Sequence, residues 1–223
     1  KREFKVEVNE GEPMVEYKEA ITLKADHREV YKKQSGGRGK FADIAFTVEP
    51  AEEGKQGLEF ISNIKGGNVP KEFIPSVEKG FKAAMTNGPL AGYEVDSMKV
   101  TLKDGSYHDV DSDQLSFELA AKIGFREAAK SARFVIMEPI MKLEVSVPEE
   151  HLGDVINDLQ QRRAIITATE IRAGINVLTA EAPLASMFGY SAAVRSVSQG
   201  RASFTMAPLK YGPAPQETAE SFV

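Results

Sequence analysis

Apolar and polar residues alternate in several short stretches of the first 137 residues, and a period of two predicts β-strands. The strands predicted from this alternation cover 4–8, 15–25, 41–48, 58–64, 98–102 and 134–137. Clusters of glycine, proline and polar residues separate several of them, as is typical of the turns between strands. This part of the chain is therefore predicted to be built around a β-sheet.

Two stretches of the same part repeat with the spacing of a helix. One begins at Pro75, a good first helical residue, and ends at Asn87-Gly88-Pro89. The other runs to about Ser131, and Asp111 with Gln114 three positions later is typical of a capping box that opens it. The buried stripe of this second helix is expected to consist of Leu115, Leu119 and Ile123.

The pattern restarts after Glu138-Pro139, which is the predicted boundary between two domains. The elements expected beyond it are a strand at 141–147, a helix starting at Pro148, strands at 165–171 and 175–179, a helix opened by Pro183, and a strand at 202–206. This order, βαββαβ, is that of the ferredoxin-like fold, which serves many unrelated functions. From Pro208 on, prolines and scattered polar residues predict a loose tail.

The loop predicted at residues 34–40 combines glycine with positive charge. Its glycines, which permit conformations and close approaches closed to other residues, are Gly36, Gly37 and Gly39. The basic residues of the stretch 31–40, which holds no acidic one, are Lys32, Lys33, Arg38 and Lys40. The whole chain has a net charge of −5, and a basic tip on an acidic body indicates contact with a polyanion, RNA first. Taken alone, the stretch favours the alternative, a solvated hairpin loop with ordinary surface charge.

A second polar loop, at 104–114, places His108 near Asp109 and Asp111. A histidine beside carboxylates can act as a metal ligand or as a general base. The chain has no cysteine and its three histidines are far apart, which argues against a metal. No nucleophile–base–orienter set surrounds His108, so a turn histidine that helps to cap a helix is the structural alternative.

The composition is that of a soluble globular protein, with 42% apolar and 27% charged residues among 223. This length suits one large domain or two ordinary ones. The lack of cysteine excludes disulfides and thiol chemistry and fits a reducing cytoplasm. No apolar run approaches the roughly 20 residues that span a bilayer, and no signal peptide is visible. The chain starts at Lys1 without an initiator Met, and we expect it to be a piece of a longer protein.

Several segments resemble those of elongation factor G, the ribosomal translocase, and they occur in family order along nearly the whole chain. They are Lys33-Gln34-Ser35-Gly36-Gly37-Arg38-Gly39, Ile64-Lys65-Gly66-Gly67, Phe73-Ile74-Pro75-Ser76-Val77, Gly88-Pro89-Leu90-Ala91-Gly92-Tyr93, Gly105-Ser106-Tyr107-His108-Asp109-Val110-Asp111-Ser112, Glu138-Pro139-Ile140-Met141, Met187-Phe188-Gly189-Tyr190 and Gly200-Arg201-Ala202-Ser203. Any one of these matches could be chance, but the ordered set is highly specific.

The resemblance implies an α+β protein made of the last domains of that factor. Residues 1–12 would be the end of domain three, and 13–137 would be domain four, a ribosomal-protein-like α/β domain with a left-handed βαβ crossover. Residues 138–207 would be the ferredoxin-like domain five, followed by a tail at 208–223. Domain four of the family imitates the anticodon arm of tRNA and enters the small-subunit decoding centre. Domain five lies near the stalk base and the sarcin–ricin loop of large-subunit RNA.

The same resemblance implies that the two polar loops bind RNA. His108 would be a tip residue that touches the codon–anticodon duplex, and Arg38 would contact phosphate through its guanidinium fork. The expected ribosome-binding residues are Gln34, Ser35, Gly36, Gly37, Arg38, Gly39, Lys40, Tyr107, His108, Asp109 and Arg201. A role of Arg201 as a cation at a helix end is about as well supported as RNA contact.

The intact parent would be a GTPase that uses GTP and Mg²⁺ and acts as a monomer on the ribosome in the cytoplasm. This chain has no Gly-x-x-x-x-Gly-Lys-Ser/Thr phosphate loop, because Gln34 holds the place of the first glycine and Phe41 follows Lys40. We therefore expect no catalytic residue, metal or cofactor in the chain itself.

Two departures from the family pattern leave a paralogue open, one that acts in ribosome recycling or ribosome protection. Ala164 follows the pair Arg162-Arg163 where many members have Gly, and the segment 211–215 differs from the common acidic tail. A third hypothesis is a stand-alone enzyme that uses His108 with Asp109, which requires a closed apolar pocket around the pair.

Overall fold

The structure, a computed structural model, describes residues 15–34 and 36–217. The chain forms two compact units, and it passes from the first to the second between Ile136 and Met137. We call residues 18–136, with 214–217, the N-terminal unit, and residues 137–213, with 15–17, the C-terminal unit. The strand predicted at 4–8 and the segment expected to end domain three, 1–12, lie outside the described residues.

The N-terminal unit is built on a four-stranded sheet with the strand order β2-β3-β5-β4. Its strands are β2 (Ala25–Lys33), β3 (Lys40–Glu49), β4 (Gly57–Ser62) and β5 (Ser97–Ser106). Neighbouring strands are antiparallel except β4 and β5, which are parallel. Between these two the chain forms a short 3-10 helix, η2 (Lys71–Phe73), and α1 (Ile74–Ala84), which completes a βαβ unit.

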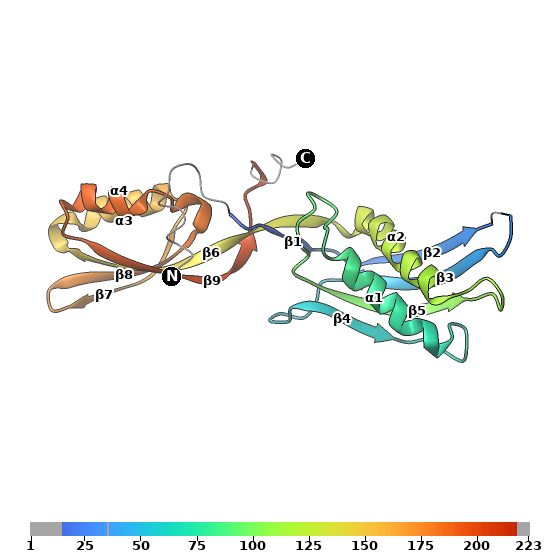
Figure 1. Ribbon diagram of the computed structural model, residues 1–223. Helices are drawn as coiled ribbons and strands as arrows, with labels where there is room; N and C mark the ends of the chain where they lie inside the picture. Colours follow the sequence, from blue (N-terminus) through green and yellow to red (C-terminus); the bar gives the residue numbers. More distant parts are fainter. Residues whose placement is uncertain (1–14, 35, 218–223) are drawn as a thin grey trace. The chain divides into compact units, whose positions relative to one another are not determined.

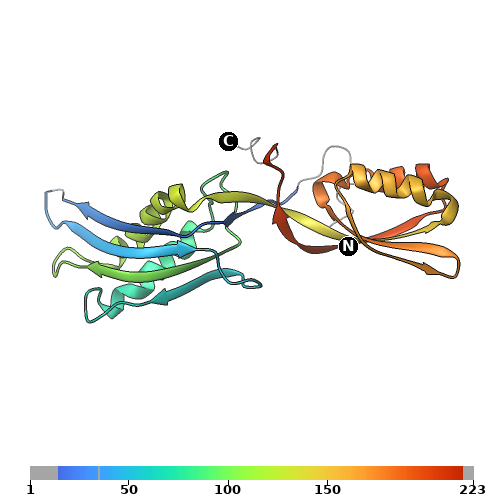
Figure 2. The ribbon, with the colours of Figure 1, turned by 180° about the vertical axis from the view of Figure 1, so that it is seen from behind.

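Helix α1 and helix α2 (Gln114–Ala132) lie over one face of this sheet, and the other face is open (Figures 1 and 2). Alternate residues of the strands, such as Phe46 on β3, point into the layer between sheet and helices. Phe46 meets Phe81 of α1 edge to face, with ring centroids 4.8 Å apart. Phe117 of α2 stacks on Phe73 at 4.9 Å. The core of the unit is therefore a sandwich of one sheet and two helices.

The stripe predicted for α2 is wrong, because Leu115 is 54% exposed and Ile123 is 36% exposed. The buried face consists of Ser116, Phe117, Ala120, Ala121, Gly124, Phe125, Ala128, Ala129 and Ala132. Alanine and glycine carry little hydrophobic signal in a sequence, yet they allow the helix to approach the sheet closely. A side chain at Gly124 would come within 2.8 Å of the Phe46 ring.

Two predicted strands of this unit also differ from the structure. The run 15–25 is not one strand, because β1 (Lys18–Ile21) pairs with β6 and β2 starts anew at Ala25 in the other sheet. Strand β5 runs on to Ser106, through residues that were expected to be a turn. Gly105 makes this possible, since a Cβ there would lie 2.3 Å from the backbone oxygen of Asp43 on the neighbouring strand.

The C-terminal unit has the predicted order βαββαβ. Its elements are β6 (Phe134–Pro148), α3 (Leu152–Gln161), β7 (Ile165–Arg172), β8 (Ile175–Pro183), α4 (Tyr190–Ser198) and β9 (Ser203–Pro213). The four strands pair antiparallel in the order β9-β6-β8-β7. This is the strand order of a ferredoxin-like fold, and the predicted fold class of two α+β domains is confirmed.

Three details of the C-terminal unit correct the prediction. β6 is continuous through Glu138-Pro139, where a break was expected; Pro139 lies opposite Tyr211 of β9, and pairing with β8 starts at Ile140. Pro183 precedes a 3-10 turn, η4 (Leu184–Ser186), and α4 begins after Gly189, which has a left-handed backbone. β9 extends to Pro213, so residues 208–213 are not a loose tail, because they pair with β6.

Candidate nucleic-acid interface

The two polar loops singled out in the sequence lie side by side at one end of the four-stranded sheet (Figures 1 and 2). We call residues 34–39, between β2 and β3, loop A, and residues 107–113, between β5 and α2, loop B. Arg38 Nε donates a hydrogen bond of 2.8 Å to the carbonyl oxygen of Val110. The amide of Phe41, just after loop A, donates to the carbonyl oxygen of Asp111 at 3.0 Å. The loops therefore form one structural feature.

Ser112 is the residue that ties loop B to the sheet. Its hydroxyl donates to the carbonyl oxygen of Phe41 at 2.8 Å and accepts from the amide of His108 at 2.9 Å. Its own amide donates to the carbonyl oxygen of His108 at 3.1 Å. The residue is almost completely buried, so these bonds are shielded from water. Loop B is consequently closed on itself and fixed to the first residues of β3.

Asp113 joins the two loops to the start of α2. Its carboxylate accepts from the amide of Ser116 at 2.7 Å, so Asp113 is the N-cap of the helix, and the capping box predicted at Asp111 and Gln114 is wrong by two residues. The other carboxylate oxygen lies 2.5 Å from Lys40 Nζ. Burial acts to raise the pKa of Asp113, but the hydrogen bonds from Lys40 and Ser116 outweigh it and lower the pKa to about 2.

A second ionic contact lies at the root of the loops. The carboxylate of Asp43 on β3 is almost completely buried and accepts two bonds from Arg28, at 2.9 Å and 2.6 Å. It also accepts from the hydroxyl of Ser106, the last residue of β5, at 2.6 Å. A bidentate arginine plus a hydroxyl satisfies a buried carboxylate. This network fixes the ends of the strands from which both loops emerge.

The glycines of loop A have different roles. Gly39 is buried, and a side chain there would come within 3.0 Å of the Asp111 carboxylate and of the backbone oxygen of Lys33. Gly36 has a φ of +52°, a conformation that favours glycine. Gly36 and Gly37 are exposed, with no atom within 4 Å of the place of a Cβ. Their bare backbone is therefore accessible to a partner.

Arg38 and Gln34 are exposed on loop A, whereas Ser35 lies outside the described residues. Within the described part of the chain Arg38 makes only the bond to Val110, through Nε. Its two terminal nitrogens stay available, and these are the donors that fit phosphate oxygens. The charge of Lys40 is instead largely neutralised by Asp113, which gives Lys40 a structural role within the predicted site.

His108 is exposed over 58% of its side chain, and Tyr107 and Asp109 beside it are exposed as well. Nδ1 of His108 accepts from the amides of Val110 and Asp111, both at 3.2 Å. In the neutral ring this acceptor role places the proton on Nε2. The ring thus holds loop B in shape with one nitrogen and offers the other to solvent or to a partner.

The surroundings of His108 bear on the enzyme hypothesis. His108 lies on an exposed surface, and the closed pocket that the enzyme hypothesis requires does not surround it. Within residues 15–34 and 36–217, no group of three or more His, Cys, Asp or Glu side chains is placed to hold a metal ion. No helix of the described residues is long and apolar enough to cross a membrane.

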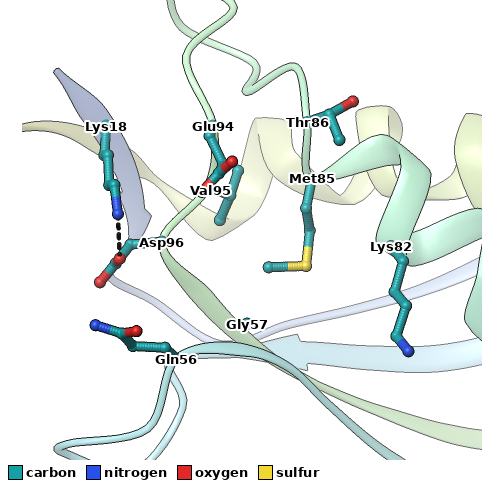
Figure 3. A pocket seen from close by; sticks show the side chains of 9 residues that line it. All are labelled: Lys18, Gln56, Gly57, Lys82, Met85, Thr86, Glu94, Val95 and Asp96. Carbon is teal, nitrogen blue, oxygen red and sulfur yellow. Dashed lines mark hydrogen bonds and ion pairs between the residues drawn. The ribbon is translucent and has the colours of Figure 1, made fainter. Parts of the chain in front are cut away.

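A separate hollow of about 280 Å³ lies in the same unit, away from both loops (Figure 3). Its lining residues are Lys18, Gln56, Gly57, Lys82, Met85, Thr86, Glu94, Val95 and Asp96. Lys18 and Asp96 face each other there in an ion pair of 3.3 Å. The lining mixes both signs of charge with one methionine and one valine, which favours no particular class of ligand, and none of the predicted site residues lines it.

Arg201, the remaining predicted residue, lies in the C-terminal unit just before β9. It is 55% exposed and forms an ion pair with Glu150 of η3 (Glu149–His151). This partner supports the structural alternative, and the geometry gives no separate reason to assign Arg201 to RNA.

The structure thus brings together all the described predicted residues except Arg201. Sequence reasoning missed the roles of Ser112, Asp43 and Arg28, which hold the loops in place. Asp43 and Arg28 gave no signal, since their pairing depends on the register of β2 with β3.

Comparison with known proteins places this geometry in a family. The model of "Elongation factor G, domain IV" matches residues 13–133, and that of "Elongation factor G C-terminus" matches residues 135–222. Proteins named elongation factor G are 58% identical over 215 residues in Karelsulcia muelleri (strain GWSS) and 54% identical over 223 residues in Amoebophilus asiaticus (strain 5a2). These alignments cover 96% and 100% of this chain, but 31% and 32% of the relatives.

A crystal structure of a protein from Thermus thermophilus superposes with a TM-score of 0.82 at 36% identity, over 94% of this chain and 31% of that one. The chain therefore spans about a third of the length of the relatives it matches. The two adjoining loops on an α/β unit, the ferredoxin-like unit that follows and these matches show that the chain belongs to the elongation factor G family.

Proposed function

We propose that this chain is the ribosome-binding C-terminal portion of a translational GTPase that promotes movement of tRNA and mRNA. In this proposal residues 13–137 act as domain four, and loops A and B enter the small-subunit decoding centre and touch the tRNA–mRNA duplex. Residues 138–207, as domain five, contact the stalk base and the sarcin–ricin loop of large-subunit RNA. GTP and Mg²⁺ are bound by the part of the factor outside this chain, and the factor acts as a monomer.

The observation that carries the proposal is the junction of the two loops through Arg38 and Val110. Two loops about 70 residues apart in sequence present Arg38, His108 and the bare backbone of Gly36 and Gly37 on one exposed surface. The phosphates and the groove edges of a duplex lie on its outer face, and a projecting protein surface can reach them. The hydrogen bonds of Ser112 and Asp113 hold the surface in one shape, which lowers the entropy cost of binding.

The test is His108→Ala in the full-length factor, with single-turnover translocation and ribosome-stimulated GTP hydrolysis measured in parallel. Loss of one hydrogen bond to RNA, about 1–2 kcal/mol, is expected to slow translocation about tenfold. GTP hydrolysis is expected to change less than about twofold, because His108 is assigned no part in nucleotide binding. Equal loss of both activities would argue against a tip that acts only in movement.

His108→Asn is the matched control for the structural role of the ring. An asparagine side chain can still accept from the amides of Val110 and Asp111, as in an Asx turn, so loop B keeps its shape. If His108 only holds the loop, this variant restores the rate; if His108 contacts RNA, it stays as slow as the alanine variant.

The departures that left a recycling paralogue open lie outside loops A and B. Ala164 is a core residue of the C-terminal unit, and 211–213 is paired strand. The relatives reported above are named elongation factor G and are 54–58% identical to this chain. The translocase is therefore the assignment that we propose, and the same assay decides it: a recycling factor would not support translocation at all.

A further inference from the structure

A third loop lies at the same end of the sheet as loops A and B. We call it loop C, residues 63–69, between β4 and η2. Because β4 runs parallel to β5, with Ser62 opposite Leu102, the chain leaves both strands at the same end. Figures 1 and 2 show the connection from β4 to α1 beside the connection from β5 to α2 at this end. None of its residues was among those predicted to bind the ribosome.

Loop C is anchored in the same polar network as its neighbours. Asn68 Nδ2 donates to Asp104 Oδ1 at 3.0 Å, and the other oxygen of Asp104 lies 3.8 Å from Arg28. Arg28 is the residue that holds Asp43 beneath loops A and B. Val69, 1% exposed, packs against Gly105, where a Cβ would lie 2.6 Å from its side chain. The position of loop C is thus fixed relative to the other two.

The outer part of loop C is bare and basic. Lys65, Gly66, Gly67 and Asn68 are exposed, and nothing lies within 4 Å of the place of a Cβ on either glycine. Gly66 has a φ of +60°, which favours glycine at this position. Lys65 makes no ion pair within the described residues, in contrast to Lys40. An ammonium group beside two accessible peptide groups is a combination that binds phosphate oxygens.

We propose that loop C is a third RNA-binding element of this surface and that it takes phosphate groups of the RNA backbone through Lys65 and the backbone of Gly66 and Gly67. The inference rests on the proposed function of loops A and B. The amide of Asn68, one of the two asparagines of loop C, is engaged by Asp104 and is not free to bind a base edge. The contribution of loop C is to affinity and orientation rather than to sequence preference.

The first test measures ribosome binding of the full-length factor as a function of salt. Lys65→Ala is compared with Lys24→Ala, an exposed lysine just before β2, at the opposite end of the same sheet. Loss of one phosphate contact is expected to weaken binding by Lys65→Ala about threefold to tenfold, and to reduce the slope of log affinity against log salt by about 0.7–0.9. Lys24→Ala is expected to leave both unchanged, and equal behaviour of the two variants would overturn the proposal.

Arg38→Ala in the same titration separates failure of this inference from failure of the proposed function. If Arg38→Ala weakens binding and Lys65→Ala does not, the RNA-binding role proposed for loop C is wrong, and the function proposed for loops A and B stands. If neither variant weakens binding although the factor still binds, the proposed RNA-facing surface itself is wrong.

A tethered hydroxyl-radical probe tests proximity to RNA directly. The chain has no cysteine, so single cysteines can be introduced into it at Gly67, at Gly37 on loop A and at Lys24. Neither Gly67 nor Gly37 has a positive φ, and neither site is crowded, so the fold should tolerate both changes. We expect ribosomal RNA cleavage from position 67 next to that from position 37 and none from position 24. Cleavage from position 37 alone would contradict the RNA-binding role proposed for loop C.

Discussion

The two ends of the four-stranded sheet use carboxylates in opposite ways. At the end away from loops A and B, Glu19 of β1 is 0% exposed. Its carboxylate accepts from the amides of Leu90, Ala91 and Tyr93 at 2.9, 2.9 and 3.0 Å. A side chain at Gly88 would lie 2.3 Å from this carboxylate, so the segment 87–93 is wrapped tightly around one buried charge.

At the end with loops A and B, by contrast, Asp113 keeps 29% of its side chain exposed and pairs with Lys40, itself 41% exposed. Arg38 and His108 stand further out, with donor groups left available. At the first end the buried carboxylate of Glu19 stabilises the fold. At the second end the partly exposed pair of Asp113 and Lys40 fixes the loops, while donor groups of Arg38 and His108 remain exposed to a partner. Substitutions should therefore change stability at one end and function at the other.

The largest effect is expected for Glu19→Ala. Three amides inside the protein lose their acceptor, and each buried unsatisfied donor costs about 1–3 kcal/mol. We expect the free energy of unfolding of the chain to fall by about 3 kcal/mol or more, measured by urea unfolding. Glu53→Ala, an exposed glutamate, is the control and should change stability by less than about 0.5 kcal/mol. A loss below about 1 kcal/mol for Glu19→Ala would remove the contrast between the two ends.

A smaller, pH-dependent effect is expected for Asp113→Asn, which keeps an acceptor for Ser116 but loses the charge that pairs with Lys40. The pKa of Asp113 is lowered from 3.8 to about 2, so its charge stabilises the fold above pH 4. This contribution is lost as the pH falls from about 4 to about 2. Because Asp113 and Lys40 are both partly exposed, we expect the free energy of unfolding of Asp113→Asn to be only about 1–2 kcal/mol below that of the wild type at pH 7.

Urea unfolding of the wild type and Asp113→Asn at pH 7, 4 and 2.5 measures this difference, which should shrink at the lowest pH. Asp109→Asn, an exposed aspartate of the same loop, is the matched control and should leave stability nearly unchanged at each pH. A difference that stays constant down to pH 2.5 would mean that the charge of Asp113 is not what stabilises the N-terminal unit.

The smallest effect on stability is expected for Arg38→Ala, within about 0.5 kcal/mol, since its one bond to Val110 lies at an exposed position. Ribosome binding by the full-length factor should nevertheless fall about tenfold, through loss of a charge-assisted contact to phosphate. Arg38→Lys keeps the positive charge but loses the planar guanidinium, so its affinity for the ribosome should lie between those of the wild type and Arg38→Ala. Parallel losses of stability and binding would show that Arg38 is structural.

The sequence by itself determined the class of the fold and the positions of the two polar loops. The period-two runs placed β3, β4 and β5 near their positions, and the order βαββαβ was readable because each element of the C-terminal unit carries its own apolar pattern. Glycine next to basic residues marked loop A, since that composition suits neither helix nor strand. These signals come from residues that are near one another in the sequence, so they can be detected without knowing which segments pack together in the fold.

The tertiary structure alone decided which loops adjoin and what holds them. The bond from Arg38 to Val110 and the pairing of Arg28 with Asp43 depend on strand register, which the spacing of residues along the chain does not give. The buried face of α2 was misjudged because its alanines become core only when a sheet lies against them. Loop C lies at the same end as loops A and B because β4 pairs parallel with β5, a contact between segments that are separated in sequence by helix α1.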